Sequence, residues 1–163
     1  MHRAERLALK AAPARKGHPM PKSTATCNSI LALIFNATAW ADIAENDTSS
    51  PAGNLYLSLH TASPGVGNNQ TTNETAYTNY ARIAVVRTAS GWDVPSGGAT
   101  ANAALAQFAQ CGASGATITH VAIGTASSGA GTVLYQGALS SSLAVANGIQ
   151  PQFAAGALDV TET

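Results

Sequence analysis

Apolar residues near the start of the chain recur at spacings of three and four between Ser23 and Glu45. They are Ile30, Leu33, Ile34, Ala37, Ala41 and Ala44. This period predicts an amphipathic helix over residues 23–45, with the Ser23 or Thr24 hydroxyl capping its first turn. Phe35 and Trp40 lie beside this stripe and widen its apolar surface. We expect the helix to be anchored, on its own sheet or on a neighbouring subunit, by five apolar side chains: Ile30, Leu33, Ile34, Phe35 and Trp40.

From Asn54 onward the pattern changes to the alternation of apolar and polar residues that is typical of strands. In residues 54–61, three leucines alternate with Tyr56, Ser58 and His60, which predicts a half-buried strand. Further alternating runs follow, separated by turn formers, of which Asn147-Gly148 gives the strongest hairpin signal. The pattern predicts a single domain over 23–163, mainly β, with a β-sandwich, jelly-roll or Greek-key barrel body over 54–163 and one N-terminal helix.

Charge is scarce and unevenly distributed along the chain. Charged residues make up only 10% of the sequence, and six of the eight Lys and Arg residues lie in the first 22 positions. We expect residues 1–22 to form a disordered basic arm, or residues 1–19 to precede a true start at Met20. The body from Ser23 onward has two basic against seven acidic residues, a net charge of −5. This balance excludes a direct nucleic-acid role for the folded body, because it offers no basic surface to phosphates.

The search for chemistry gives few candidates. The sequence contains no nucleotide-binding loop, no zinc motif and no nucleophile elbow, so we expect no cofactor, metal or catalytic residue. His60 and His120 could meet and, with Asp93, bind a metal or complete a Ser-His-Asp arrangement, but a structural role on their strands is favoured. Cys27 and Cys111 are expected to be buried thiols. The longest apolar run, Ile30–Phe35, has six residues and is too short to span a membrane.

The two cations of the body are the remaining candidates for a site. Arg82 and Arg87 are the only Lys or Arg residues after position 22, where the chain has seven acidic residues. We expect each to form a structural ion pair with a carboxylate such as Glu74 or Asp93, or to make a subunit contact. Recognition of an anionic ligand is the alternative interpretation.

Four segments together carry a resemblance to a known family. They are Asn54–Gly65 (NLYLSLHTASPG), 72–92 (TNETAYTNYARIAVVRTASGW), 116–139 (ATITHVAIGTASSGAGTVLYQGAL) and 145–162 (VANGIQPQFAAGALDVTE). In this order the chain resembles, from Met20 to Glu162, a family of small virion proteins of tailed double-stranded DNA phages. Its members are commonly described as tail-fibre proteins, and some are similar to cement proteins that decorate the capsid. The resemblance implies a β-sandwich or jelly-roll body without catalysis or cofactor.

The resemblance also implies a place in the virus particle. We expect a non-enzymatic capsid cement or decoration subunit that bridges capsid proteins and stabilises the head. Its partners would be the major capsid protein and copies of itself, as a dimer or trimer, at the capsid surface after synthesis in the bacterial cytoplasm. A tail or tail-fibre-associated structural protein is the first alternative. A carbohydrate-binding β-sandwich module for host attachment, with Trp92 as the aromatic residue to test, is the second.

Overall fold

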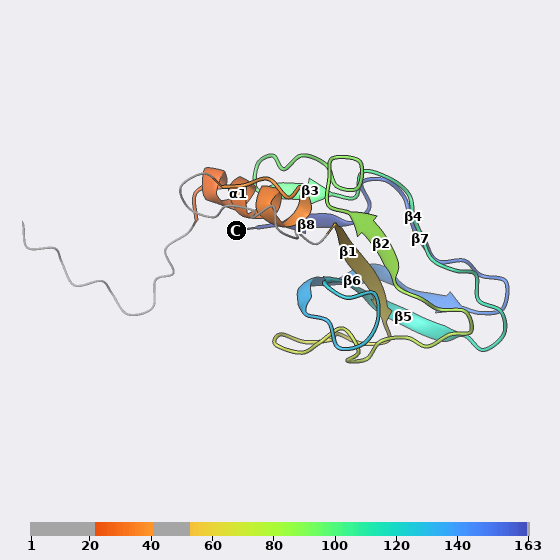
Figure 1. Cartoon of the computed structure of the whole chain (residues 1–163). Coiled ribbons are helices and arrows are strands. Elements are labelled where there is room, and N and C mark those ends of the chain that lie inside the picture. Colours follow the sequence, from red (N-terminus) through yellow and green to blue (C-terminus); the bar gives the residue numbers. More distant parts are fainter. Residues whose placement is uncertain (1–21, 41–52, 163) are drawn as a thin grey trace, which may run out of the picture.

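The computed structural model describes residues 22–40 and 53–162, and in these ranges the chain forms one helix and eight strands (Figure 1). The helix, α1, spans Thr24–Phe35. Four strands form an antiparallel sheet in the order β2-β1-β5-β6, with bounds β1 Asn54–His60, β2 Ile83–Val86, β5 Ala116–Gly124 and β6 Val133–Val145. The other strands form two antiparallel ribbons: β3 (Ala99–Ala101) with β8 (Asp159–Thr161), and β4 (Ala106–Gln107) with β7 (Gln152–Phe153). The predicted class, mainly β with one N-terminal helix, is confirmed, whereas a jelly-roll topology is not.

The leucine face of β1 forms the centre of the hydrophobic core. Leu57 is in register with Ile83 of β2 and with Ile123 of β5, so these side chains share one face of the sheet. The segments around α1 and the two ribbons cover this face with Phe35, Trp92, Phe108, Leu158 and Val160, all of them buried. Each large apolar side chain buried in this way contributes about 1.5–3 kcal/mol.

The opposite face of β1 is covered as well, which the alternation of the sequence did not predict. Ser58 and His60 point to this side and are 0% exposed. The loop over residues 61–75 crosses this face, and the Thr75 N–H donates to the Leu59 carbonyl at 2.9 Å. Gln70 of the same loop is also fully buried, with its Oε1 accepting from the Ala126 N–H at 3.0 Å. Strand β1 is therefore a central strand buried on both faces.

Helix α1 is shorter than the sequence predicted. Ser23 caps its start as expected, because the Ser23 hydroxyl accepts from the Thr26 N–H at 3.2 Å. The helix ends at Phe35 instead of residue 45, because Ala37 adopts a left-handed backbone conformation with φ 51°. The chain then turns back, and the Thr38 N–H donates to the Ala32 carbonyl at 3.1 Å. Residues 41–45 of the predicted helix lie outside the described residues.

The buried side of α1 also differs from the predicted one. Cys27, Leu31 and Phe35, spaced by four residues, are 4%, 0% and 0% exposed. Of the predicted anchoring residues, Phe35 is buried, whereas Ile30, Leu33, Ile34 and Trp40 are half-buried. The Phe35 ring packs edge-on against Trp92 with ring centroids 4.6 Å apart, and lies 5.5 Å from Tyr135. Phe35 therefore anchors the helix in its own domain.

The two ends of the described domain are joined. The Lys22 ammonium forms an ion pair with Glu162, whose second carboxylate oxygen accepts from the Tyr135 hydroxyl at 3.1 Å. The hydrogen bond to Lys22 lowers the pKa of Glu162. The first and last described residues are thus joined, and the C-terminal end follows β8 close to α1 (Figure 1).

Candidate functional site

His60 lies in a sealed polar cluster beneath the loop over residues 61–75. Its Nδ1 is 3.0 Å from the Thr72 carbonyl, and its Nε2 is 2.9 Å from the Ser58 hydroxyl. A carbonyl oxygen can only accept, so Nδ1 carries the proton and Nε2 accepts from Ser58. Burial lowers the pKa of His60 and favours its neutral form. The histidine therefore joins β1 to the loop that covers it.

This cluster is not built for nucleophilic catalysis. Ser58 and His60 have the contact that a Ser-His pair needs, but both are 0% exposed, and a main-chain carbonyl stands where a carboxylate would be. Asp93 is exposed on the surface, and its main-chain N–H donates to the Ala101 carbonyl at 2.9 Å. His120 is in register with His60, and its Nδ1 is 2.8 Å from the Thr119 hydroxyl. In the part of the chain that the structure describes, no three His, Cys, Asp or Glu side chains gather as a metal site requires.

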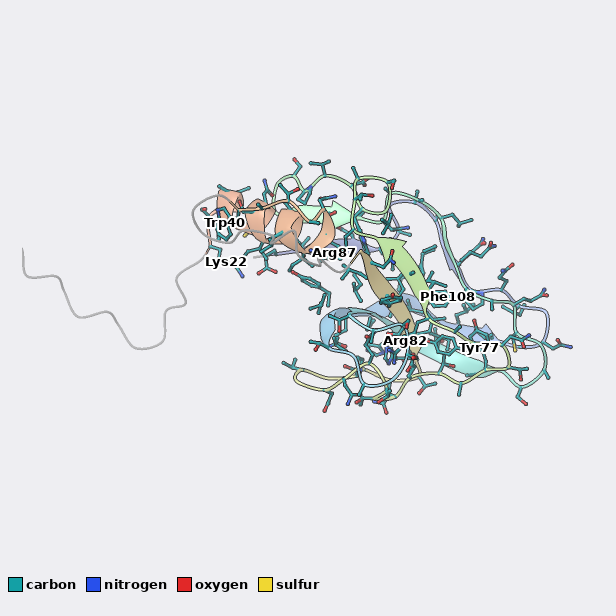
Figure 2. The ribbon with its side chains drawn as sticks, viewed as in Figure 1. Lys22, Trp40, Tyr77, Arg82, Arg87 and Phe108 are labelled. Carbon is teal, nitrogen blue, oxygen red and sulfur yellow. The ribbon has the colours of Figure 1, made fainter. Side chains whose placement is uncertain are left out.

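Arg82, labelled in Figure 2, forms a bidentate ion pair with Glu74. Its Nε lies 2.6 Å from Glu74 Oε1, and its Nη2 lies 2.7 Å from Oε2. Tyr80 joins the pair, because its hydroxyl donates to Glu74 Oε1 at 2.8 Å and accepts from the Leu59 N–H at 3.0 Å. The hydrogen bond to Glu74 raises the pKa of Arg82, and burial raises the pKa of Tyr80. The three side chains tie the segment after the loop to β1.

The rest of the Arg82 guanidinium holds a second loop. Its Nη1 donates to the Ala126 carbonyl at 2.9 Å and its Nη2 to the Gly129 carbonyl at 2.8 Å. These carbonyls belong to the turn between β5 and β6. The Arg82 side chain is only 2% exposed, so its donors face the protein and not an external ligand. Arg82 therefore forms a structural ion pair, and its partner is Glu74, one of the two carboxylates named from the sequence.

Arg87 binds the C-terminal end of α1. Its Nε donates to the Ile34 carbonyl at 2.5 Å and its Nη2 to the Leu33 carbonyl at 2.6 Å. Figure 2 labels Arg87 close to the helix. Carbonyls in the last turn of a helix lack intrahelical partners and carry the negative end of the helix dipole, so a cation is favoured there. Burial lowers the pKa of Arg87. Arg87 therefore links the end of β2 to α1 through main-chain carbonyls, a partner type that sequence reasoning did not foresee.

A groove separates the β5–β6 side of the sheet from the C-terminal segment 151–161. Its volume is about 640 Å³, and its floor is the apolar face of the sheet, including Ile118, Val121 and Ile123. Gly137 of β6 is in register with Val121 and contributes no side chain, and a Cβ at Gly137 would meet no atom within 4 Å. At Gly137, β6 therefore contributes no side chain to the groove, and the space beside Val121 stays open.

The outer wall of the groove is held by a buried asparagine. Asn102 is 0% exposed, and its Nδ2 donates to the Ala104 and Ala154 carbonyls at 2.8 Å each. Its Oδ1 accepts from the Leu158 N–H at 2.8 Å. These bonds fix the segment 154–158 opposite the sheet. Sequence reasoning missed the groove because its two sides are far apart in the chain, although Gly137 within an apolar strand was a local signal.

The aromatic side chains of the groove are engaged in packing. Tyr135 contacts Phe35, and its hydroxyl is bound to Glu162, while the Phe153 ring lies 6.3 Å from that of Phe108. Trp92, the residue expected to test carbohydrate binding, is 0% exposed and belongs to the core. No helix within the described ranges is long and apolar enough to cross a membrane.

Comparison with known proteins supports one family. The family model described as "Podophage GP4 fiber I protein gp80" matches residues 21–161, which include every described helix and strand. A search of curated proteins found no match. The description names a fibre protein of a phage, so the resemblance to phage virion proteins described as tail-fibre proteins is confirmed, whereas the similarity to capsid cement proteins gains no support from this match. The chain therefore belongs to the phage fibre family described as Podophage GP4 fiber I protein gp80.

Proposed function

We propose that this protein is a non-enzymatic structural subunit of the tail fibre of a tailed phage. The family match over residues 21–161 carries the proposal. The side chains that could do chemistry support it, because each holds the fold together. His60 binds the main chain of its covering loop, Arg82 binds Glu74 and the β5–β6 turn, and Arg87 binds the end of α1.

The position in the particle distinguishes a tail-fibre subunit from the capsid cement subunit expected first. Both would be small, β-rich and free of catalysis, so the fold alone favours neither. The family match is to a fibre protein, which supports the tail-associated alternative. The partners are then other tail proteins and further copies of this chain. A contact with the major capsid protein is expected only of a cement subunit.

Immunogold labelling of purified particles tests this proposal. Antibodies raised against the isolated chain are first absorbed with particles that lack it, which removes antibodies to other virion proteins. Gold confined to the tail is the expected result, and cryo-electron microscopy of the same particles should show the corresponding density there. Label spread over the icosahedral shell would overturn the tail assignment and restore the cement interpretation.

Carbohydrate recognition stays a prediction that the groove does not strengthen. Its floor is aliphatic, and the rings of Tyr135 and Phe153 already pack on other aromatic residues. A glycan array with the isolated protein tests this alternative directly. Binding that is lost in Phe153→Ala but kept in an exposed control variant, Ala155→Ser, would establish it.

A further inference from the structure

We propose that the outer edge of β6 is a self-association surface, at which a second copy of the chain adds its own β6 in antiparallel orientation across a two-fold axis. Strand β6 is the last strand of the sheet and pairs with β5 alone. No backbone hydrogen bond joins its other side to any residue in the described ranges. Unpaired N–H and C=O groups along such an edge are a template for another strand.

The side chains of β6 leave its surface open. Eight of the nine residues from Gln136 to Ala144 are exposed, and the ninth, Leu139, is half-buried. The whole strand, VLYQGALSSSLAV, contains no charged residue and no proline. Natural sheets usually protect an open edge with lysine, proline, a bulge or a covering segment. Here two register shifts interrupt the pairing with β5: one places the four residues 139–142 opposite Thr119, and the other leaves Leu134 without a register partner. Between them, Tyr135–Ala138 remain in regular register.

The other edge of the same sheet is strand β2, which is shorter and partly covered. Strand β2 has four residues and is flanked by Arg82 and Arg87. The segment 104–107 lies beside it, across a shallow space that both line. The fold therefore keeps one edge short and partly covered, and leaves the other longer and exposed. This contrast indicates that β6 is covered by an assembly contact.

Charge favours a second copy as the occupant. A two-fold contact brings each residue near its own counterpart, so a charged edge would repel itself. The body carries a net charge of −5, and β6 is a stretch of its surface without that charge. The small side chains of Gly137, Ala138 and Ser140 also allow a second backbone to approach closely.

The size of the contact shows that the groove must contribute to it. Strand β6 extends along the nine residues of β5, which span about 30 Å, and a strip about 10 Å thick then buries about 300 Å² per copy. Two copies give about 600 Å², which is below the roughly 1,000 Å² expected of a specific interface. The groove beside β6 supplies the remaining area, because partner side chains can enter the space that Gly137 leaves over Val121 and Ile123.

A matched pair of lysine variants tests the proposal on the full chain. Ala138→Lys places a charge on the β6 edge, and Ala84→Lys places the same charge at an exposed position of β2. Sedimentation equilibrium should show a dimer for the unaltered protein. We expect at least a tenfold increase in the dimer dissociation constant for Ala138→Lys, and less than a twofold change for Ala84→Lys. Circular dichroism establishes that both variants are folded.

Disulfide cross-linking gives a second, independent measurement. Cys27 and Cys111 are buried, so an added surface cysteine dominates oxidation. Ala138→Cys should give a covalent dimer, and Ala84→Cys should not. A monomer at all concentrations, a trimer, or cross-linking through Ala84→Cys would each overturn pairing through β6. The result does not depend on where the protein lies in the particle, so the tail-fibre proposal is tested separately.

Discussion

Replacing Arg82 by leucine should lower the free energy of unfolding by about 3–5 kcal/mol, the usual cost of removing one partner of a buried ion pair. The change leaves the Glu74 carboxylate with the Tyr80 hydroxyl as its only side-chain partner among the contacts described. It also removes the donors of the Ala126 and Gly129 carbonyls. Arg82 is 2% exposed in its side chain and Glu74 is 15% exposed, so water cannot fully replace the guanidinium.

The magnitude follows from the number and kind of bonds lost. A hydrogen bond to a charged group contributes about 1.5–3 kcal/mol, and Arg82 makes two such bonds to Glu74. The loss for Arg82→Leu should lie in the upper part of its range if water does not reach the Ala126 and Gly129 carbonyls in the variant. It should lie in the lower part if water hydrogen-bonds to the Gly129 carbonyl. Against a typical total stability of about 5–15 kcal/mol, the loss should be visible in any equilibrium measurement.

Urea unfolding followed by circular dichroism measures this loss, and a double-mutant cycle with Glu74→Gln assigns it. The coupling energy of the two changes should lie between about 1 and 3 kcal/mol, because each abolishes the charge pair between Arg82 and Glu74. Amide hydrogen exchange should also become faster in residues 125–131, the turn that Arg82 holds. A loss below about 1 kcal/mol, or additive effects of the two variants, would refute the interpretation of Arg82 as a buried clamp.

Three further predictions concern the core and the buried polar groups. The fold lowers the pKa of His60, so the unfolded chain binds a proton at higher pH than the folded chain does, and the free energy of unfolding should fall as pH drops below 6.5. Unfolding free energies measured at several pH values test this. The same pH dependence in His60→Gln would contradict it. Phe35→Ala should cost about 3–5 kcal/mol, and the half-buried Ile30→Ala clearly less; equal losses in thermal unfolding would show that the buried face of α1 is assigned wrongly. Gly124→Ala should lower the stability, because its Cβ would lie 2.2 Å from the Gln70 Cδ and the buried Gln70 side chain would have to move; a variant with unchanged stability would disprove this contact.

The parts of the fold that local pattern controls could be predicted from the sequence. The leucine alternation of β1 and the Ser23 cap depend on residues close together in the chain. The buried face of α1 could not be predicted in the same way, because Leu31 and Ile30 are equally apolar. Their burial differs because Trp92 and Tyr135, distant in sequence, meet the helix at Phe35.

Within the candidate site, an ion-pair partner could be named from the sequence only because the body contains few carboxylates. Arg82 had few carboxylates available, so Glu74 could be named as a partner from the sequence. Arg87 donates to two main-chain carbonyls of α1, a kind of acceptor that every residue carries and that no sequence pattern marks. The burial of His60 depends on the loop over residues 61–75 folding back over β1, a long-range event that alternation within the strand cannot reveal.

The ion pair between Lys22 and Glu162 has a consequence for how the domain can be connected. The chain therefore enters and leaves the described fold at neighbouring points, as chain ends of domains often do. Joining these ends and opening the chain at the exposed turn Asn147-Gly148 should yield a circular permutant with the same core. A partner joined directly at residue 22 or at residue 162 would leave the described fold close to α1.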